Sequence, residues 1–121
     1  MFRVTARGAD RLDIELSGKL NTEEMAVALD ELVDKSKDIK HGRMLYEIID
    51  FHLPSLGAIG VELSRLPEMF RLTKRFDRVA VLTDKTWLQK VSELEGLLYP
   101  HLEIKGFSRS QKVEAETWLA G

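Results

Sequence analysis

The spacing of hydrophobic residues predicts that strands and helices alternate along most of this chain. Two short strand patterns come first, at residues 2–6 and 12–16, with a turn of small and acidic residues at 8–10. In the second pattern, leucine and isoleucine alternate with aspartate and glutamate, so we expect one face of this strand to meet solvent. The two patterns therefore predict a hairpin at the edge of a sheet.

A helical period begins after Gly18. Asn21 stands at an N-cap position and Glu24 follows three residues later, which is the spacing of a capping box. The apolar residues beyond them have the spacing of a helix that lies on a sheet: Met25, Ala28, Leu29, Leu32 and Val33. A dense apolar run at 44–49, which ends at Asp50, then predicts a buried strand.

A second helix is predicted to begin near Ser55, with Ile59, Leu63, Leu66 and Phe70 at helical spacing. Because Pro67 has no N–H to donate to the Leu63 carbonyl, we expect a kink or a break there. Basic residues gather along and after this helix: Arg65, Arg71, Lys74, Arg75 and Arg78. They are consistent with a solvated edge, or with an amphipathic segment that meets an anionic partner or lipid headgroups.

Two further strand–helix units complete the pattern. Four consecutive apolar positions within 78–83 predict an interior parallel strand, and Asp84 is placed to cap a helix that contains Trp87, Val91, Leu94 and Leu98. A strand with Leu102 and Ile104 precedes a last helix that begins at Ser108 and contains Ala115, Trp118 and Leu119. The order β-β-α-β-α-β-α-β-α predicts one α/β domain over residues 1–121. It would have a mixed, mainly parallel five-stranded sheet and four helices, with the first strand antiparallel to its neighbour.

Composition excludes several functional classes. The 121 residues include no cysteine, which excludes disulfides, zinc ribbons and thiol catalysis. A net charge of -2 argues against bulk attraction to nucleic acid. No apolar run approaches the roughly 20 residues that span a bilayer, and the first residues lack the apolar stretch of a signal peptide. We therefore expect no stable membrane insertion and a cytoplasmic protein.

Candidate catalytic residues follow the third and fourth strands, where open α/β sheets bind ligands. Asp50 and Asp84 could together hold a divalent cation, and His52 could assist acid–base chemistry. However, Asp84 already has a capping role, and the three histidines lie far apart in different elements. We therefore expect no enzyme, no metal and no cofactor, and keep an enzyme based on these three residues as the weakest hypothesis.

The order of the elements and several short stretches carry a family resemblance. The stretches are Gly18 to Asn21, Ser55 to Ala58, Phe76 to Leu82 with Trp87 and Leu88 beyond it, Phe107, and Glu114 to Leu119. With the whole chain they resemble the SpoIIAA-like group of STAS domains, and more narrowly bacterial STAS/SEC14 domain-containing proteins. This resemblance implies a SpoIIAA-like fold and a binding or regulatory module.

The resemblance also draws attention to Ser55. In the anti-sigma-factor antagonists of that family, a kinase phosphorylates a serine in an Asp-Ser-Ser-Gly turn at the start of the second helix. Ser55 falls on that position, but the stretch Pro54 to Gly57 lacks the acidic residue and the second serine. The free N–H groups of a helix N-terminus favour a phosphate, and they equally explain Ser55 as an ordinary N-cap.

Two hypotheses for function precede the enzyme. The first is a non-catalytic interaction domain that binds a protein partner through the second helix and its preceding loop, with contacts from Phe51, His52, Leu56, Leu63, Arg65, Leu66, Met69 and Phe70. The second follows the Sec14 resemblance and is a binder or sensor of a small apolar ligand or lipid, held beneath the same apolar helix. Exposed helix surfaces would also allow a homodimer.

Overall fold

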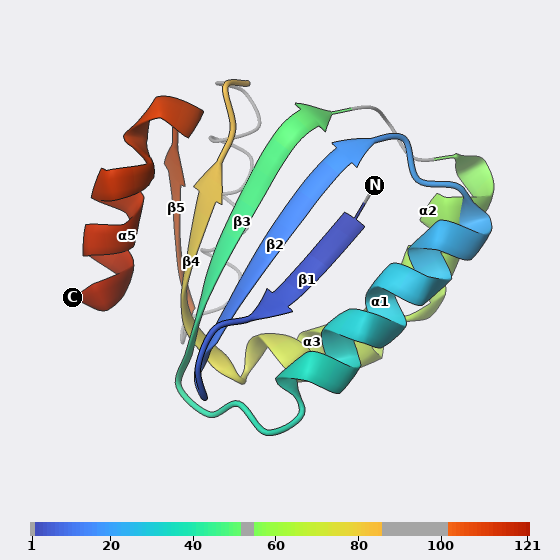
Figure 1. Ribbon diagram of the computed structural model, residues 1–121. Helices are drawn as coiled ribbons and strands as arrows, with labels where there is room; N and C mark the ends of the chain where they lie inside the picture. The colour runs from blue at the N-terminus through green and yellow to red at the C-terminus, as the bar shows by residue number, and fades with distance from the viewer. Residues whose placement is uncertain (1, 52–54, 86–101) are drawn as a thin grey trace.

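The computed structural model describes residues 2–51, 55–85 and 102–121, which form a twisted sheet with helices on both faces (Figure 1). The strands pair in chain order, as β1-β2-β3-β4-β5. β1 is antiparallel to β2, and the remaining pairs are parallel. The predicted α/β class and the mixed, mainly parallel five-stranded sheet are confirmed. The strands are β1 Phe2–Ala6, β2 Arg11–Gly18, β3 Gly42–Phe51, β4 Phe76–Leu82 and β5 Glu103–Phe107.

The described helices follow the predicted order. They are α1 Thr22–Ser36, α2 Leu56–Ser64, α3 Leu66–Thr73 and α5 Lys112–Ala120, and a 3-10 turn, Arg109–Gln111, leads into α5. The predicted helix with Trp87, Val91, Leu94 and Leu98 lies outside the described residues.

The N-terminus of α1 has the predicted capping box. The Asn21 side chain accepts the Glu24 N–H at 2.8 Å, and the Glu24 carboxylate accepts the Asn21 N–H at 3.1 Å. Two N–H groups that the helix leaves without partners are thereby satisfied, which fixes where α1 begins.

The second predicted helix is broken near Pro67, as its position predicted. α2 ends at Ser64, and α3 begins at Leu66, so that Pro67 lies in the first turn of a new helix. A proline is tolerated there because the N–H groups of a first turn have no intrahelical partner. Arg65 lies at the corner between α2 and α3.

Two apolar layers cover the two faces of the sheet, and this explains the dense apolar run of β3. Met44 packs with Leu12 and Ile14 in a cluster that also includes residues of α1 and α3. Its neighbour Leu45 points to the opposite face and packs in a second cluster, whose other buried members are Ala80, Leu82, Phe107, Ala115 and Leu119. Successive residues of a strand alternate between faces, so β3 is apolar on both.

The acidic face of β2 differs from the expectation of a solvated face. The Asp13 side chain is only 16% exposed, because it forms ion pairs with Arg7 at 2.6 Å and Arg11 at 2.8 Å. Arg11 also pairs with Glu116 of α5. The charges on this face are therefore largely neutralised by one another.

β1 is one of the two edge strands of the sheet, and a lysine of α1 contacts its backbone. The Lys35 ammonium donates a hydrogen bond to the Val4 carbonyl at 2.6 Å and pairs with Glu31 at 2.8 Å. The predicted edge hairpin is therefore confirmed, with its outer edge tied to α1.

Candidate functional site

The candidate site is built around the N-terminus of α2, just beyond the carboxyl end of β3. The Ser55 hydroxyl oxygen accepts the Ala58 N–H at 3.1 Å, and the Ser55 carbonyl accepts the Ile59 N–H at 3.0 Å. These bonds make Ser55 the N-cap of α2. The Ser55 N–H donates to the Leu20 carbonyl at 3.1 Å, which ties the cap to the loop between β2 and α1.

The inner side of α2 is packed closely against α1. Ala58 is fully buried in a cluster with Leu20, Met25 and Leu29. A Cβ atom added to Gly57 would lie 2.0 Å from the Thr22 side-chain oxygen, so the first turns of the two helices meet where glycine leaves room. These contacts with α1 therefore fix the position of α2.

The opposite side of α2 is apolar and exposed. Leu56 is 88% exposed and Leu63 is 60% exposed, and because they are seven residues apart they share one helix face. Gly60 lies between them on that face, where an added Cβ would meet no other atom within 4 Å. We call the surface formed by Leu56, Gly60 and Leu63 the α2 outer face. Leu66, at the start of α3, is also exposed.

Arg65 holds the corner between α2 and α3 to α1. Its guanidinium pairs with Asp30 at 2.7 Å, donates to the Ala26 carbonyl at 3.3 Å, and pairs with Glu68. The hydrogen bond to Glu68 is the largest cause that raises the pKa of Arg65, which therefore stays charged. Its side chain is only 19% exposed. This arrangement positions the corner and leaves little of Arg65 for a partner to contact.

The remaining predicted contact residues are Met69, Phe51, His52 and Phe70. Met69 is partly buried against the cluster of Leu20, Met25 and Leu29, and so lies beneath α3 rather than on its surface. Phe51 ends β3, but its side chain lies outside the described part of the structure, as do His52 and the side chain of Phe70. The structure thus brings Ser55, Leu56 and Leu63 together on α2.

The residues proposed for an enzyme do not form a described metal site. Asp84 accepts the Arg109 N–H at 3.0 Å, and Asp50 is exposed at the end of β3. Across residues 2–51, 55–85 and 102–121, no group of three or more His, Cys, Asp or Glu side chains is placed to hold a metal ion. None of the helices described in these ranges is long and apolar enough to cross a membrane.

Sequence reasoning missed two contacts that shape this site. It grouped Arg65 with the free cations of the second helix, although Asp30 of α1 pairs with it, and it did not identify the close approach of Gly57 to Thr22. A glycine in the first turn of a predicted helix is the available signal for such an approach, since it lowers helix propensity without forming a turn.

Comparisons with known proteins give one matching family model and similar solved structures. The family model described as SpoIIAA-like matches residues 11–120. An uncharacterized DUF3478-family protein from Shewanella loihica PV-4, whose crystal structure has a SpoIIAA-like fold, aligns with a TM-score of 0.75 and 21% identity, over 98% of this chain and 92% of that one. The phosphorylated form of the Bacillus cell fate determinant SpoIIAA aligns with a TM-score of 0.57 and 13% identity, over 94% of this chain and 97% of that one. At 21% and 13% sequence identity, these two structures show that the fold is shared and nothing more. No curated protein matches this chain in sequence.

Proposed function

The chain belongs to the SpoIIAA-like family of regulatory and interaction domains, and from that premise we propose that it binds a protein partner through the α2 outer face. The N-terminus of α2 at Ser55 would form one margin of the contact. The proposed role is regulatory and non-catalytic: binding would change the activity of the partner.

The exposure of two leucines on a firmly packed helix carries this proposal. Leu56 and Leu63 are 88% and 60% exposed, while Ala58 on the other side of α2 is fully buried. Burying a leucine side chain stabilises a complex by about 1.5–3 kcal/mol. A partner with a complementary apolar groove would therefore gain from a helix that is already held in place.

Ser55 offers a means to control this contact. SpoIIAA of Bacillus has a phosphorylated form, and the family resemblance implies a phosphorylated serine at the start of the second helix, where this chain has Ser55. A phosphoserine carries about -1.5 to -2 charges, which the N–H groups of a helix N-terminus can accommodate. The phosphate would lie next to Leu56, and so we propose that phosphorylation weakens the apolar contact at that end of α2.

A capture experiment tests the docking surface. Purified wild-type protein, Leu56→Asp and Val113→Asp would each be used to retain partners from a lysate of cells that naturally make the protein. Val113 is a matched control, because it is 77% exposed but lies on α5. We expect a partner that wild type and Val113→Asp retain and Leu56→Asp loses. Identical partner sets for all three proteins would contradict the proposal.

The same variants test whether the partner is a second copy of this chain. Light scattering after gel filtration would give the mass of each protein in solution. A wild-type dimer that Leu56→Asp converts to monomer, with Val113→Asp unchanged, would identify the α2 outer face as a homodimer surface.

The alternative Sec14-like function would require apolar side chains to face an internal pocket. Leu63 and Leu66 are exposed, and Met69 packs into the cluster that contains Leu20 and Met25. These positions favour a surface contact over a pocket lined by the same three residues. Native mass spectrometry of the purified protein distinguishes the two functions, since a lipid that co-purifies at one copy per chain would favour the carrier.

A further inference from the structure

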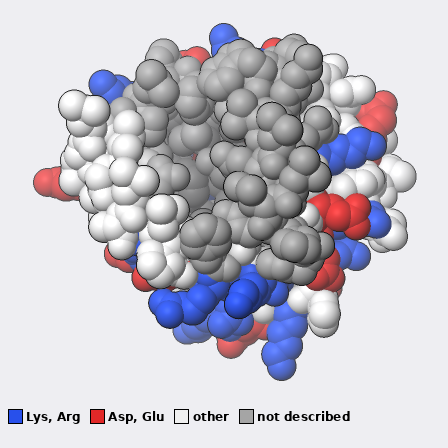
Figure 2. Space-filling view, turned by 180° about the vertical axis from the view of Figure 1, so that it is seen from behind, with Lys and Arg blue, Asp and Glu red and all other residues white. Residues whose placement is uncertain are grey.

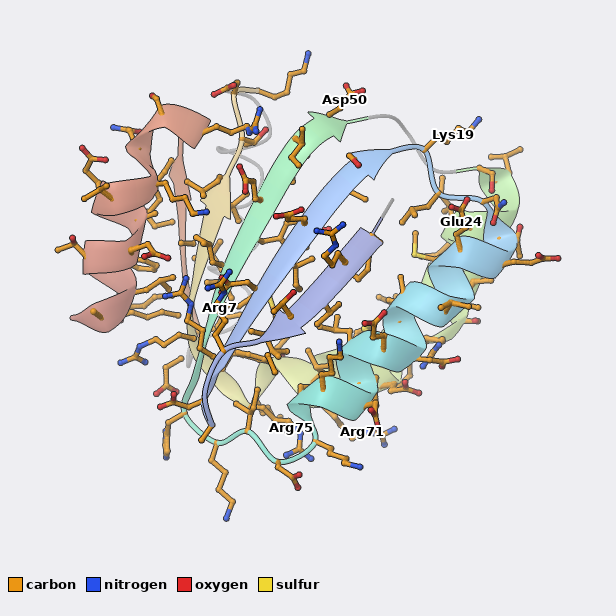
Figure 3. All side chains as sticks on the ribbon, in the orientation of Figure 1. Arg7, Lys19, Glu24, Asp50, Arg71 and Arg75 are labelled. Atoms are coloured by element: carbon orange, nitrogen blue, oxygen red, sulfur yellow. The ribbon has the colours of Figure 1, made fainter. Side chains whose placement is uncertain are left out.

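Two grooves lined by basic residues lie at the end of the molecule opposite α2's N-terminus. One, of about 390 Å³, is lined by Ile39, Lys40, His41, Arg71, Lys74 and Arg75. The other, of about 280 Å³, lies beside it and is lined by Val33, Ser36, Lys37, Glu68, Arg71, Leu72 and Arg75. Arg71 and Arg75 line both grooves, and Figure 3 shows them at the end of the molecule away from Lys19 and Asp50. Figure 2 shows basic side chains gathered at this lower end. We call this surface the basic end.

The segments that form the basic end are fixed to one another. The Gly42 N–H donates to the Arg75 carbonyl at 2.8 Å, and the Arg75 guanidinium donates to the Ile39 carbonyl at 3.4 Å. A Cβ added to Gly42 would lie 2.4 Å from the Ile39 side chain, so the loop before β3 is tightly packed against its surroundings. His41 has a φ of 52°, which a histidine rarely adopts. The backbone that carries these cations, and the Arg75 guanidinium, are therefore held in place before any ligand arrives.

Most carboxylates near the basic end are paired with basic side chains other than Lys40, Arg71, Lys74 and Arg75. Glu68 pairs with Arg65, and Asp77 pairs with His41 at 3.3 Å and with Arg43 at 3.7 Å. Asp34 pairs with Lys37 at 3.5 Å. Asp38 is exposed in the same loop. Among the ion pairs of the described residues, none involves Lys40, Arg71, Lys74 or Arg75, so these four cations keep their charge available.

A purely structural role for these cations is the competing explanation. α1 and α3 both end near this surface, at Ser36 and Thr73. Positive side chains near a helix C-terminus stabilise it through their attraction to the negative end of the helix dipole. This effect explains why cations occur here, but it does not require arginines shared between two grooves. The two explanations differ in what they predict for binding.

We infer that the basic end binds a small anion with two or more phosphate groups, with one phosphate in each groove and Arg71 and Arg75 between them. Arginine suits this task because its planar guanidinium can donate two parallel hydrogen bonds to a phosphate. Lys40 and Lys74 line the larger groove and add point charges. This site lies at the opposite end of β3 from Ser55 and does not depend on the proposed partner contact.

Calorimetric titration with sodium tripolyphosphate at low ionic strength tests the site. We expect saturable binding with one tripolyphosphate per chain. The double variant Arg71→Gln/Lys74→Gln should weaken this binding at least tenfold, since both side chains are exposed and line the larger groove. The matched control, Lys19→Gln/Lys85→Gln, removes two exposed cations outside both grooves and should bind as wild type does.

Four results would overturn the inference. Absence of saturable binding by wild type would do so, and equal weakening in both double variants would show attraction to net charge alone. A third is a lower melting temperature for Arg71→Gln/Lys74→Gln with unchanged tripolyphosphate affinity, which would leave only the helix-stabilising role. Sedimentation with phosphatidylglycerol vesicles distinguishes a membrane from a free anion. Vesicle binding without affinity for tripolyphosphate would also overturn the inference.

Discussion

Two glycines in the same helix should respond in opposite directions to the same substitution. Gly60 lies on the α2 outer face, where an added Cβ meets nothing within 4 Å. Gly60→Ala should therefore raise the free energy of unfolding by about 0.5–1 kcal/mol, because alanine loses less backbone entropy in a helix. Gly57→Ala gains a similar amount, but its Cβ would lie 2.0 Å from the Thr22 side-chain oxygen.

The magnitude of the second effect follows from that overlap. Crowding of a well-packed contact typically costs about 1–3 kcal/mol. After the gain in helix propensity is subtracted, Gly57→Ala should be destabilised by up to about 2 kcal/mol. The two variants should therefore differ by about 1–3 kcal/mol.

Urea denaturation followed by circular dichroism measures this difference. For a urea m-value of about 1–3 kcal/mol per molar, a difference of 2 kcal/mol separates the two midpoints by roughly 0.7–2 M. Thr22→Ala removes the oxygen that the new methyl group would meet, and Gly57→Ala should be tolerated in that background. Equal stability of Gly57→Ala and Gly60→Ala would mean that the Thr22 side chain moves aside without a loss of stability. That result would refute the fixed contact between α1 and α2.

Three other contacts can also be tested by substitution. Arg65→Gln should lower the free energy of unfolding by about 1 kcal/mol, since paired surface charges contribute up to about 1 kcal/mol each. In the same urea experiment, the control Arg71→Gln should change the free energy of unfolding by less than half as much. The hydrogen bond from Arg11 lowers the pKa of Glu116 below its ordinary value of 4.5, so the pair's stabilising contribution is present above pH 4.5 and is lost as pH falls through the lowered value. Melting temperatures of Glu116→Gln should therefore fall less than those of wild type on acidification below pH 4.5, and an equal fall would contradict this. Ser55→Ala should lose about 1 kcal/mol with the N-cap, whereas Ser55→Asp should keep stability and still reduce partner capture, which separates the cap from the proposed regulation.

Local signals in the sequence predicted much of the fold. The capping box at Asn21 and Glu24 and the break before Pro67 each depend on residues a few positions apart, and both are confirmed. The alternation of strands and helices likewise predicted the mainly parallel sheet and the antiparallel β1. Such features are predictable because backbone geometry imposes them locally.

Contacts between distant residues were not predictable in the same way. The order of the strands was left open, because pairing depends on which apolar faces meet. Arg65 was expected to contact a partner, but the ion pair with Asp30 joins residues 35 positions apart, on different helices. Leu56 and Leu63 were among the expected contacts, but helical spacing alone does not tell which apolar side of α2 is buried against α1.

The contact between Lys35 and the Val4 carbonyl has a consequence for solubility. A foreign strand that adds to β1 must first displace this ammonium from the backbone oxygen. Lysines at the margins of β-sheets commonly discourage such additions and the aggregation that follows. Lys35 therefore acts as a gatekeeper, and a Lys35→Met chain should form insoluble aggregates faster than wild type in a light-scattering assay at equal concentration.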